Sequence, residues 1–379
     1  MPRPIRALID TAALNHNFNA LKRGLAMSQA TRQAPTKIWA VVKADAYGHT
    51  LDAAIAAFAQ ADGLAMLDFQ EAARCRQAGW EKPILMLEGL FGREDLDVAV
   101  ELGLTLVVHE QRQLSLLEQA QAEKPFNIYL KMNTGMHRLG FEAADYLQAY
   151  ARLQALQQVG KVGDITHMTH FAYAEREDGI NEPMAVFKEA VQGLRGHWCV
   201  SNSAATLAHS NPLSQQWVPP DIELWLRPGI CLYGGSPFER RPAGEFELKS
   251  AMTLKSELIS VRQVRAGEGV GYGHTFIADK PMMVGVVACG YADGYPRHAP
   301  TGTPIAVGGF RTRLVGRVSM DMLTVDLSDL PNSMVGDEVV LWGEGGPTAD
   351  EVAHAAGTIS YELLTAVTAR VPRRLISHR

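Results

Sequence analysis

The chain has 379 residues, more than one ordinary hydrophobic core holds, so we expect two domains. Hydrophobic residues make up 47% of it and charged residues 20%, which indicates a folded globular protein and excludes a disordered one. The net charge of -5 at pH 7 argues against a nucleic-acid surface. No apolar run approaches the roughly 20 residues that span a bilayer, so no membrane segment is expected.

The cysteines and the N-terminus indicate the compartment. Cys75, Cys199, Cys231 and Cys289 are widely separated and form no C-x-x-C pair. This spacing favours reduced thiols over a disulfide framework or a zinc site. The first residues, MPRPIR, lead into a strand-like segment without the apolar stretch of a signal peptide. We therefore expect a cytoplasmic protein.

Short apolar runs alternate with helical patterns from about residue 37 to 234. Between the runs lie amphipathic segments, such as the one in which Asp68 can cap a helix and Glu71 can complete a capping box. Eight runs followed by helices or turns predict a (β/α)8 barrel. A doubly wound sheet also alternates, but it usually has fewer strands, and no G-x-G-x-x-G follows the first run. The predicted strands are Ile38–Lys43, Gly63–Leu67, Ile84–Leu87, Leu104–Val108, Asn127–Met132, Asp164–His170, Trp198–Asn202 and Leu226–Tyr233.

Past about residue 245 the pattern changes to short strands separated by glycine-rich turns. A helix over 349–356 then precedes a closing segment that contains Tyr361. We predict an α/β chain with a barrel domain over residues 1–245 and a β-rich domain over 246–379, with the first residues as candidates to join the second domain. The strands predicted in the second domain are Ser256–Val264, Met283–Cys289, Thr303–Val307, Thr312–Val318, Leu323–Leu327 and Glu338–Trp342.

The candidate functional residues follow the C-terminal ends of the predicted barrel strands, where barrel active sites lie. Lys43 ends the first strand, and a lysine in a dry pocket has a lowered pKa and can form a Schiff base. Its alternative is an exposed strand-end lysine. The loops after strands seven and eight often bind phosphate, which suits Ser203 and the Gly229–Ile230 backbone. The other candidates at these ends are Lys131, Arg138, His170 and Arg227.

Each of these residues also has a simpler interpretation when it is taken alone. Arg138 would be a surface residue, Ser203 a helix cap and Tyr272 an exposed turn residue. The spacing of His167 and His170 resembles that of a metal-binding pair, but residues three apart on a strand point to opposite faces. They would chelate poorly, so we expect no metal.

Several motifs, in order along the chain, together resemble the alanine racemases, pyridoxal-phosphate enzymes of fold type III. They are KADAYGH from Lys43, TGMHRLG from Thr134, RPGI from Arg227, GYG from Gly271, GYADGY from Gly290 and RVPR from Arg370. Thr50 departs from the family, which usually has glycine there, and Ser319 stands where some members carry cysteine. Neither difference changes the assignment of the lysine.

The resemblance implies the catalytic groups. Lys43 would hold pyridoxal 5'-phosphate as a Schiff base and serve as one of two bases, and Tyr272 of the other subunit would be the opposite base. Racemisation removes a proton from one face of Cα and returns one to the other, so two groups on opposite faces are an economical solution. The pKa of a tyrosine is near 10, and the family assists it through a chain from Tyr272 to His170 to Arg227. Arg227 would face the pyridine nitrogen and disfavour its protonation.

The resemblance also implies the binding groups. Arg138 would lie near the cofactor's phenolic oxygen and the substrate carboxylate, which the backbone N–H of Met320 would also hold. Lys131 is a candidate for carbamylation that would orient Arg138, and Tyr291 resembles a residue at the narrow entrance. The phosphate cradle would comprise Tyr47, Ser203, Gly229, Ile230 and Tyr361.

The leading hypothesis is an alanine racemase, a homodimer with shared active sites that interconverts L- and D-alanine for peptidoglycan supply or D-alanine catabolism. One rival is a racemase for serine or with broad specificity, although extracytoplasmic members of that kind carry a signal segment. A fold-type-III decarboxylase is disfavoured by the Gly-Tyr-Gly motif and Arg227. A non-catalytic pyridoxal-phosphate-binding protein has the barrel alone, so the second domain with Tyr272 argues against it.

Overall fold

The computed structural model describes residues 3–29, 32–121 and 124–377, and it divides into two compact units. We call Phe18–Ala46 with Ala54–Leu232 the barrel unit. We call Met1–Asn17, Tyr47–Ala53 and Tyr233–Arg379 the β unit. Each unit is described by itself. Among the described residues, no helix combines the length and the apolar character that crossing a bilayer requires.

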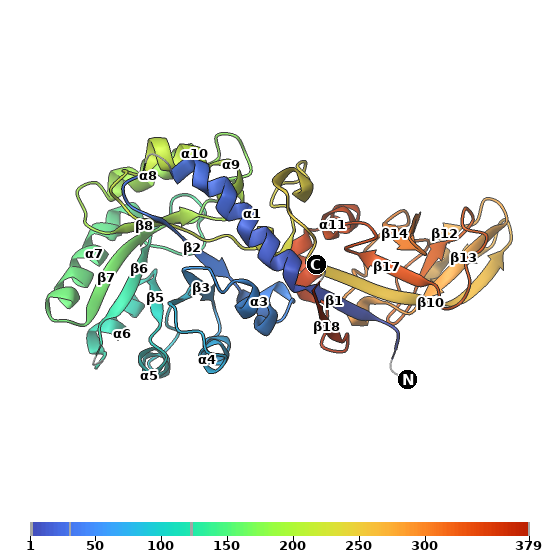
Figure 1. The fold of residues 1–379 in the computed structure, drawn as a ribbon, viewed down its shortest axis with the longest axis horizontal. Coiled ribbons are helices and arrows are strands. Elements are labelled where there is room, and N and C mark those ends of the chain that lie inside the picture. The colour runs from blue at the N-terminus through green and yellow to red at the C-terminus, as the bar shows by residue number, and fades with distance from the viewer. Residues whose placement is uncertain (1–2, 30–31, 122–123, 378–379) are drawn as a thin grey trace. The chain divides into compact units, whose positions relative to one another are not determined.

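Eight parallel strands of the barrel unit close into a barrel, which confirms the predicted (β/α)8 fold (Figure 1). The last strand returns to the first, with Ile38 opposite Leu226. The strands are β2 (Thr36–Val41), β3 (Gly63–Met66), β4 (Ile84–Met86), β5 (Thr105–Val108), β6 (Phe126–Lys131), β7 (Val162–Met168), β8 (His197–Ser201) and β9 (Leu224–Leu226).

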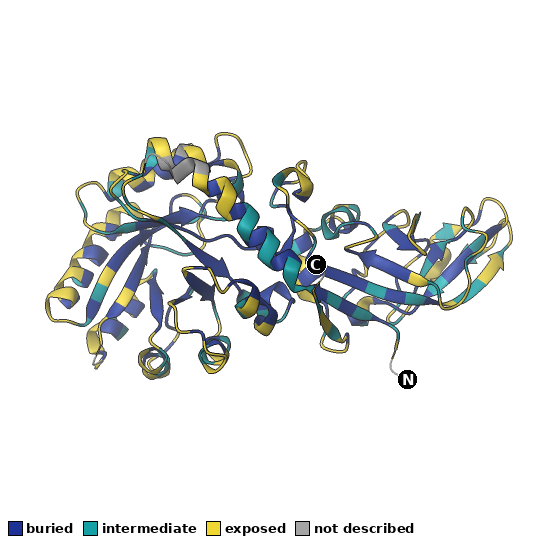
Figure 2. Cartoon of the chain, in the orientation of Figure 1, coloured by how far each residue is buried: buried dark blue, intermediate teal, exposed yellow. Residues whose placement is uncertain are grey.

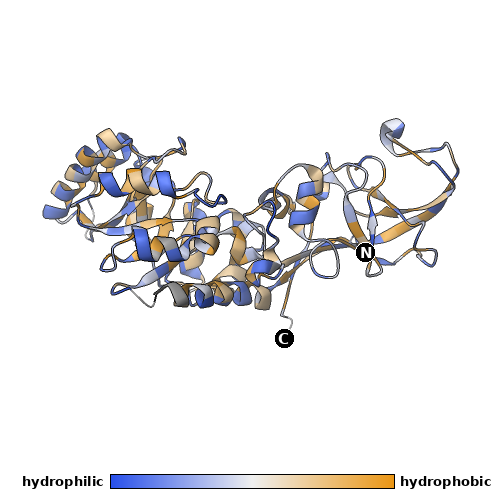
Figure 3. Ribbon diagram, turned by 90° about the horizontal axis from the view of Figure 1, so that it is seen from above, coloured by the Kyte–Doolittle hydropathy of each residue, from blue (hydrophilic) through white to orange (hydrophobic). Residues whose placement is uncertain are grey.

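Helices follow the barrel strands and carry both hydrophilic and hydrophobic residues (Figure 3). Asp68 caps α4 as predicted, since its side chain accepts a hydrogen bond from the Gln70 N–H. Glu71 does not complete a capping box there, because its carboxylate accepts the N–H of Asp45 at 2.6 Å. The helices from the N-terminus through the barrel are α1 (Thr11–Gln29), α2 (Lys43–Tyr47), α3 (Leu51–Ala57), α4 (Phe69–Gln77), α5 (Glu94–Glu101), α6 (Gln111–Gln119), α7 (Ala143–Gln158), α8 (Asn181–Ala190), α9 (Ser203–Ala208) and α10 (Ser210–Pro212).

The eighth barrel strand differs from its predicted range. It covers Leu224–Leu226 rather than Leu226–Tyr233, and Ile230–Tyr233 forms a 3₁₀ helix, η2. Pro228 has no N–H to give to a ladder, so it ends the strand and turns the chain. The residues after the strand therefore form a loop at the barrel's C-terminal face.

The β unit is built on an eight-stranded sheet in which β1 (Arg6–Asp10) lies between β10 (Met252–Val264) and β18 (Arg373–Ile376). The strand-like segment expected after the first residues is observed as β1, whereas β18 was not predicted, because its partner lies at the other end of the chain. Tyr361 lies on a further helix, α12 (Ser360–Ala366), which follows α11 (Ala349–Ala356). The other strands of this sheet are β13 (Met282–Val287), β14 (Pro304–Val307), β15 (Phe310–Arg313), β16 (Leu323–Asp326) and β17 (Glu338–Trp342), and a separate two-stranded sheet consists of β11 (Gly269–Val270) and β12 (Phe276–Ile277).

Each unit has its own packed interior, and Figure 2 shows its strands buried along much of their length. In the barrel, Trp39 stacks on Trp225 and donates its indole N–H to the Tyr129 hydroxyl at 3.0 Å. In the β unit, Tyr295 stacks on Trp342, with ring centroids 6.0 Å apart. Loops of both units carry the predicted site residues.

Candidate active site

Lys43 follows the end of the first barrel strand, as predicted. The Val41 N–H donates to the Pro228 carbonyl at 3.1 Å, and the Val42 N–H donates to the Ala65 carbonyl at 2.8 Å. Burial lowers the pKa of Lys43, the charge of Arg138 lowers it further, and Glu88 raises it. A lysine in this environment keeps more of the neutral amine that attacks carbonyls.

The backbone after Lys43 makes a left-handed turn. Ala44, Asp45, Ala46 and Tyr47 have φ of 58°, 49°, 56° and 52°. Such a conformation costs roughly 1–2 kcal/mol per residue for side chains other than glycine. The bond from the Asp45 N–H to Glu71 and an ion pair between Asp45 and Arg74 at 3.6 Å help to hold it. Strain of this kind concentrates at functional sites, and it fixes the direction in which Lys43 leaves the strand.

Lys131, Arg138 and His170 line one pocket at the end of β6 and β7, together with Met132, Asn133, Thr134, Met136 and Leu139. Lys131 is only 6% exposed. Burial lowers its pKa to about 7, and the charges of Arg227, Arg138 and Lys43 act in the same direction. The barrel mouth is therefore rich in positive charge.

Arg227 follows β9 and is buried, with 4% exposure. Its guanidinium donates to the Thr169 carbonyl at 2.7 Å and to the Cys199 carbonyl at 2.8 Å. It also contacts the Cys199 Sγ at 2.9 Å and the His170 Nδ1 at 3.2 Å. These contacts with the ends of β7 and β8 fix the guanidinium in one orientation.

The contact with Arg227 assigns the protonation of His170. A guanidinium can only donate hydrogen bonds, so Nδ1 of His170 accepts and its proton resides on Nε2. Burial lowers the pKa of His170 well below its ordinary value, and the charges of Arg227 and Lys131 lower it further. The neutral imidazole therefore offers an Nε2–H donor.

Ser203, Gly229 and Ile230 meet where the loops after β8 and β9 come together. The Ser203 hydroxyl oxygen accepts the Gly229 N–H at 2.8 Å. Ser203 is not the helix cap of its simpler interpretation, because the Asn202 side chain takes that place and accepts the Ala205 N–H at 3.0 Å. The hydroxyl proton of Ser203 remains available to donate to an acceptor such as a phosphate oxygen.

Tyr47 and Tyr361 are brought together in the β unit. The Tyr47 ring stacks on Tyr233 with centroids 4.6 Å apart, and its centroid lies 6.1 Å from that of Tyr361. Gly48 has φ of 78°, and a Cβ there would stand 2.2 Å from the Leu364 carbonyl oxygen. Only glycine permits this close approach of the Tyr47 turn to α12.

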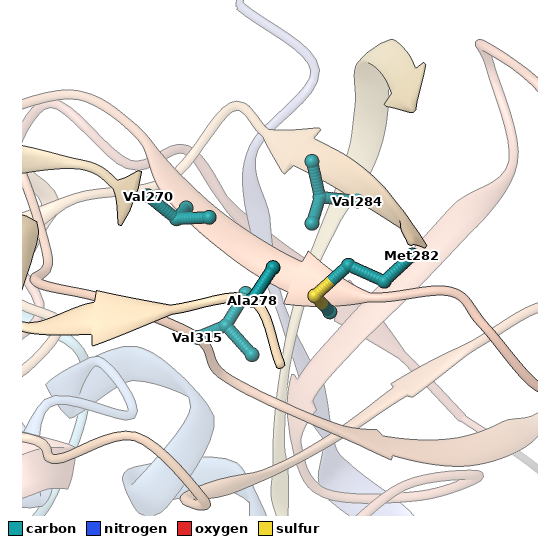
Figure 4. Close-up of a cluster of buried hydrophobic side chains, with 5 residues drawn as sticks. All are labelled: Val270, Ala278, Met282, Val284 and Val315. Atoms are coloured by element: carbon teal, nitrogen blue, oxygen red, sulfur yellow. The ribbon is translucent and has the colours of Figure 1, made fainter. Parts of the chain in front are cut away.

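Tyr272 lies at the tip of the β11–β12 hairpin and is 68% exposed. The glycines on either side, Gly271 and Gly273, have φ of 73° and 70°, so the turn needs residues without Cβ. A buried apolar cluster of Val270, Ala278, Met282, Val284 and Val315 anchors the hairpin (Figure 4). The cluster holds the hairpin in place, and the phenol of Tyr272 is exposed to solvent at its tip.

Tyr291 and Met320 lie on two loops that bond to each other through their backbones. The Tyr291 N–H donates to the Ser319 carbonyl at 3.1 Å, and the Ala292 N–H donates to the Met320 carbonyl at 2.9 Å. Both Tyr291 and Met320 are exposed. The β unit thus places two further predicted site residues side by side.

Both units match protein families. Residues 9–237 match the model described as the alanine racemase N-terminal domain, and residues 251–375 match the alanine racemase C-terminal domain. The chain belongs to the alanine racemase family. Its fold and its class, that of an amino-acid racemase enzyme, are those of this family, which confirms the resemblance read from the motifs.

Relatives resemble the chain over its full length. Alanine racemase from Bordetella petrii is 53% identical over 381 residues, covering 98% of this chain and 99% of that protein. The alanine racemase from Ralstonia nicotianae is 49% identical, covering 98% and 95%. The crystal structure of the biosynthetic alanine racemase from Pseudomonas aeruginosa matches with a TM-score of 0.89 and 43% identity, covering 99% of both chains.

Two residues that contact the site were not predicted from the sequence as part of it. Glu71 was read as part of a helix cap, whereas it holds the turn after Lys43. Cys199 was read as an ordinary reduced thiol, whereas it contacts the Arg227 guanidinium. Glu71 comes from helix α4 and Cys199 from strand β8, and the local sequence carries no signal for either contact.

Proposed function

We propose that this chain interconverts L- and D-alanine with pyridoxal 5'-phosphate attached to Lys43. The observation that carries the proposal is a lysine of lowered pKa at the C-terminal mouth of a (β/α)8 barrel, in a chain of the alanine racemase family. There are three alternatives: a serine or broad-specificity racemase, a decarboxylase and a non-catalytic binding protein. Measurements of activity would distinguish them from an alanine racemase.

The residues of the barrel mouth fit the cofactor. Pyridoxal phosphate carries anionic phosphate and phenolic groups, and the mouth supplies Lys43, Lys131, Arg138 and Arg227 with Glu88 as the carboxylate that opposes them. The Ser203 hydroxyl, whose oxygen accepts the Gly229 N–H, is a donor for the phosphate, and the backbone N–H of Ile230 is assigned as a second donor. We assign the phosphate to Ser203, Gly229 and Ile230 of the barrel unit and to Tyr47 and Tyr361 of the β unit.

Bound pyridoxal phosphate withdraws electrons from Cα of the amino acid and so makes its proton acidic. In the proposal, the neutral amine of Lys43 takes or returns a proton at Nζ on one face of Cα. The hydroxyl of Tyr272 from the partner subunit does the same at Oη on the other face. One fixed base would tend to restore the starting enantiomer, whereas two bases invert it.

The pair of Arg227 and His170 has two roles in the proposal. The Nε2–H of His170 donates to the Tyr272 oxygen and stabilises its anionic form, because Arg227 occupies Nδ1. The guanidinium of Arg227, which cannot give up its proton at ordinary pH, faces the pyridine nitrogen and keeps that nitrogen unprotonated. Both roles depend on the single orientation that Thr169 and Cys199 impose on Arg227.

The substrate carboxylate is assigned to Arg138 and to the backbone N–H of Met320, with Tyr291 at the entrance. Lys131 is assigned as a site of carbamylation, since its lowered pKa leaves a neutral amine that can add carbon dioxide. The carbamate would be an anion beside Arg138 and would orient it. We assign alanine rather than a larger amino acid as the substrate because the relatives that the chain resembles are alanine racemases.

The proposal includes the assembly and the setting. Residues 1–245 form the cofactor domain, with the first residues as candidates to join the second, and residues 246–379 supply Tyr272 and the dimer contacts. Two chains form a cytoplasmic homodimer with two shared sites. Similarity to the biosynthetic Pseudomonas enzyme favours D-alanine supply for peptidoglycan over D-alanine catabolism.

Complementation between inactive variants tests the proposal. Lys43→Ala and Tyr272→Phe proteins are each assayed for alanine racemisation, then mixed, dissociated and reassociated. In a mixed dimer, one site carries both lesions and the other has an intact Lys43 and an intact Tyr272. About half the dimers are mixed after statistical exchange, so activity should recover to roughly a quarter of the wild-type value.

The matched control mixes Lys43→Ala with His170→Ala, both of which lie in the barrel unit. Every site in that mixture carries a lesion, so the mixture should show no more activity than the two variants show separately. If the first mixture also stays inactive although exchange of subunits is demonstrated, the shared site is wrong. A wild-type protein that binds pyridoxal phosphate without racemising alanine would refute the function itself.

A further inference from the structure

We infer that Arg3, Asp293, Asp321 and Arg370 form a positioning cluster that holds the Tyr291 and Met320 loops for substrate binding; the inference rests on the function proposed above for those loops. We call these four residues the Asp293 cluster. They come from both ends of the chain and from the two loops, and all lie in the β unit. None of them is assigned a role in the chemistry.

Asp293 is the centre of the cluster and has no exposed surface. Its carboxylate accepts the Gly290 N–H at 2.9 Å, Arg370 Nε at 2.7 Å and Arg3 Nη2 at 3.2 Å. An unpaired buried carboxylate is costly, so the two arginines and the backbone N–H are what make its burial favourable. The position of the Tyr291 loop, which contains Asp293, is therefore tied to both arginines.

The same two arginines reach the other loop. Arg370 Nη2 contacts the Asp321 carboxylate at 2.5 Å, and Arg3 Nη1 lies 3.3 Å from it. Arg3 Nη2 also donates to the Asp321 carbonyl at 2.7 Å. Asp321 follows Met320 directly, so each arginine bridges the two loops through the nitrogen atoms of one planar group. A lysine, with a single nitrogen, could not match this geometry.

The loops themselves are in close contact beneath the cluster. A Cβ at Gly290 would stand 2.4 Å from the carbonyl oxygens of both Ser319 and Met320. The Thr368 hydroxyl, two residues before Arg370, donates to the Ala292 carbonyl at 2.9 Å. The cluster, the glycine contact and the backbone bonds therefore fix the backbones of Met320 and Tyr291 relative to each other.

The main variant is Asp293→Asn in the full-length holoenzyme. Its side-chain oxygen can still accept the Gly290 N–H, but the charge that pairs with Arg3 and Arg370 is gone. We expect KM for both enantiomers of alanine to rise about tenfold while kcat changes less than about twofold, because the displaced groups bind substrate rather than transfer protons. Hydrogen exchange of the peptides over 289–294 and 319–323 should become faster, by about tenfold or more.

Two further variants keep the test decisive if Asp293→Asn does not fold. Arg370→Gln and Arg3→Gln alter side chains that are 39% exposed, and each should raise KM and speed exchange in the same two peptides. Their effects should not add in the double variant, since both arginines act on the same two carboxylates. Arg370→Lys should have a KM between that of the wild type and that of Arg370→Gln.

Arg311→Gln is the matched control. It breaks a two-bond ion pair with Glu351 in the same unit, and neither residue belongs to the two loops. KM and exchange of the two peptides should stay at wild-type values. Unchanged exchange in the cluster variants would overturn the inference, because the cluster would not hold the loops. Faster exchange with an unchanged KM would overturn it too, and would place the failure in the proposed contact of these loops with substrate.

Discussion

Lys131 should carry a carbamate at neutral pH, and its burial gives the size of the effect. Burial and the neighbouring arginines lower its pKa from 10.5 to about 7. A fall of this size multiplies the ratio of neutral to charged amine by roughly three thousand at any pH well below 7. Since carbon dioxide adds only to the neutral amine, the neutral fraction decides the reaction: near pH 8 it is about nine-tenths for a pKa of about 7 and about 0.3% for a pKa of 10.5, so Lys131 is favoured over an ordinary exposed lysine by about three hundredfold.

The carbamate can be observed directly. Holoenzyme equilibrated with ¹³C-bicarbonate near pH 8 should show a protein-bound carbamate carbon by NMR, and the signal should be lost as the pH falls and the amine is protonated. Lys131→Met should lack the signal and should have a kcat/KM for alanine lower by about tenfold, because Arg138 loses an oriented anion beside it. A signal that persists in Lys131→Met, or none in the wild type, would refute the assignment.

The same shift predicts a pH dependence of stability in buffer free of carbon dioxide. The native pKa lies below the unfolded value, so between pH 7 and 10.5 the unfolded state binds one proton more than the native state at this residue. The stability difference between wild type and Lys131→Met should therefore move in favour of the wild type by about 1.4 kcal/mol per pH unit over that window. Below pH 7 the difference should level off, because the amine is charged in both states. Parallel curves from denaturant titrations would show that the lysine is not desolvated.

Two further substitutions test the proton chemistry. Arg227→Glu should lower racemisation and raise the amount of pyruvate formed per alanine racemised, because a carboxylate would favour a protonated pyridine nitrogen; an unchanged ratio would place Arg227 elsewhere. Tyr272→Phe should reduce turnover in both directions yet leave Lys43 able to exchange the Cα proton of D-alanine with solvent deuterium. If that exchange disappears along with racemisation, the two faces have been assigned the wrong way round.

Repetition is what made the fold predictable from the sequence. Eight apolar runs at regular spacing predicted the barrel, and seven of them lie within a few residues of the observed strands. The eighth was misplaced because Ile230–Tyr233 is apolar for a different reason: it is buried as a 3₁₀ helix after Pro228. An apolar run reports burial more faithfully than it reports conformation.

The strands of the β unit show where local pattern fails. β1 pairs with β10 and β18, so its place in the sheet depends on residues some 250 and 370 positions along the chain. The predicted strand Thr312–Val318 is observed as Phe310–Arg313, which pairs with β14 across the Gly308–Gly309 turn. The turn fixes the register of that hairpin, and the apolar residues after it are buried without belonging to it.

The residues of the candidate site were predicted from sequence motifs. The motifs predict the position of some of these residues, but not the contacts that other side chains make with them. Lys43, Arg227 and His170 lie at strand ends, so the barrel topology brings them to one face as expected. The strained turn after Lys43 depends on side chains from helix α4, and the contact of Cys199 with Arg227 joins the ends of two strands. No spacing rule encodes such pairs.

The positively charged side chains at the barrel mouth repel one another, and a bound anion would reduce that repulsion. Lys43, Lys131 and His170 all have a lowered pKa, in part because each lies near other cations. A cluster of positive charge that is partly removed from water disfavours the folded chain by itself. An anionic cofactor and a carboxylate substrate would relieve that repulsion, and its loss would then contribute to their binding affinity. Natural proteins often contain locally unfavourable interactions at functional sites, and the strained left-handed turn after Lys43 lies at the same site.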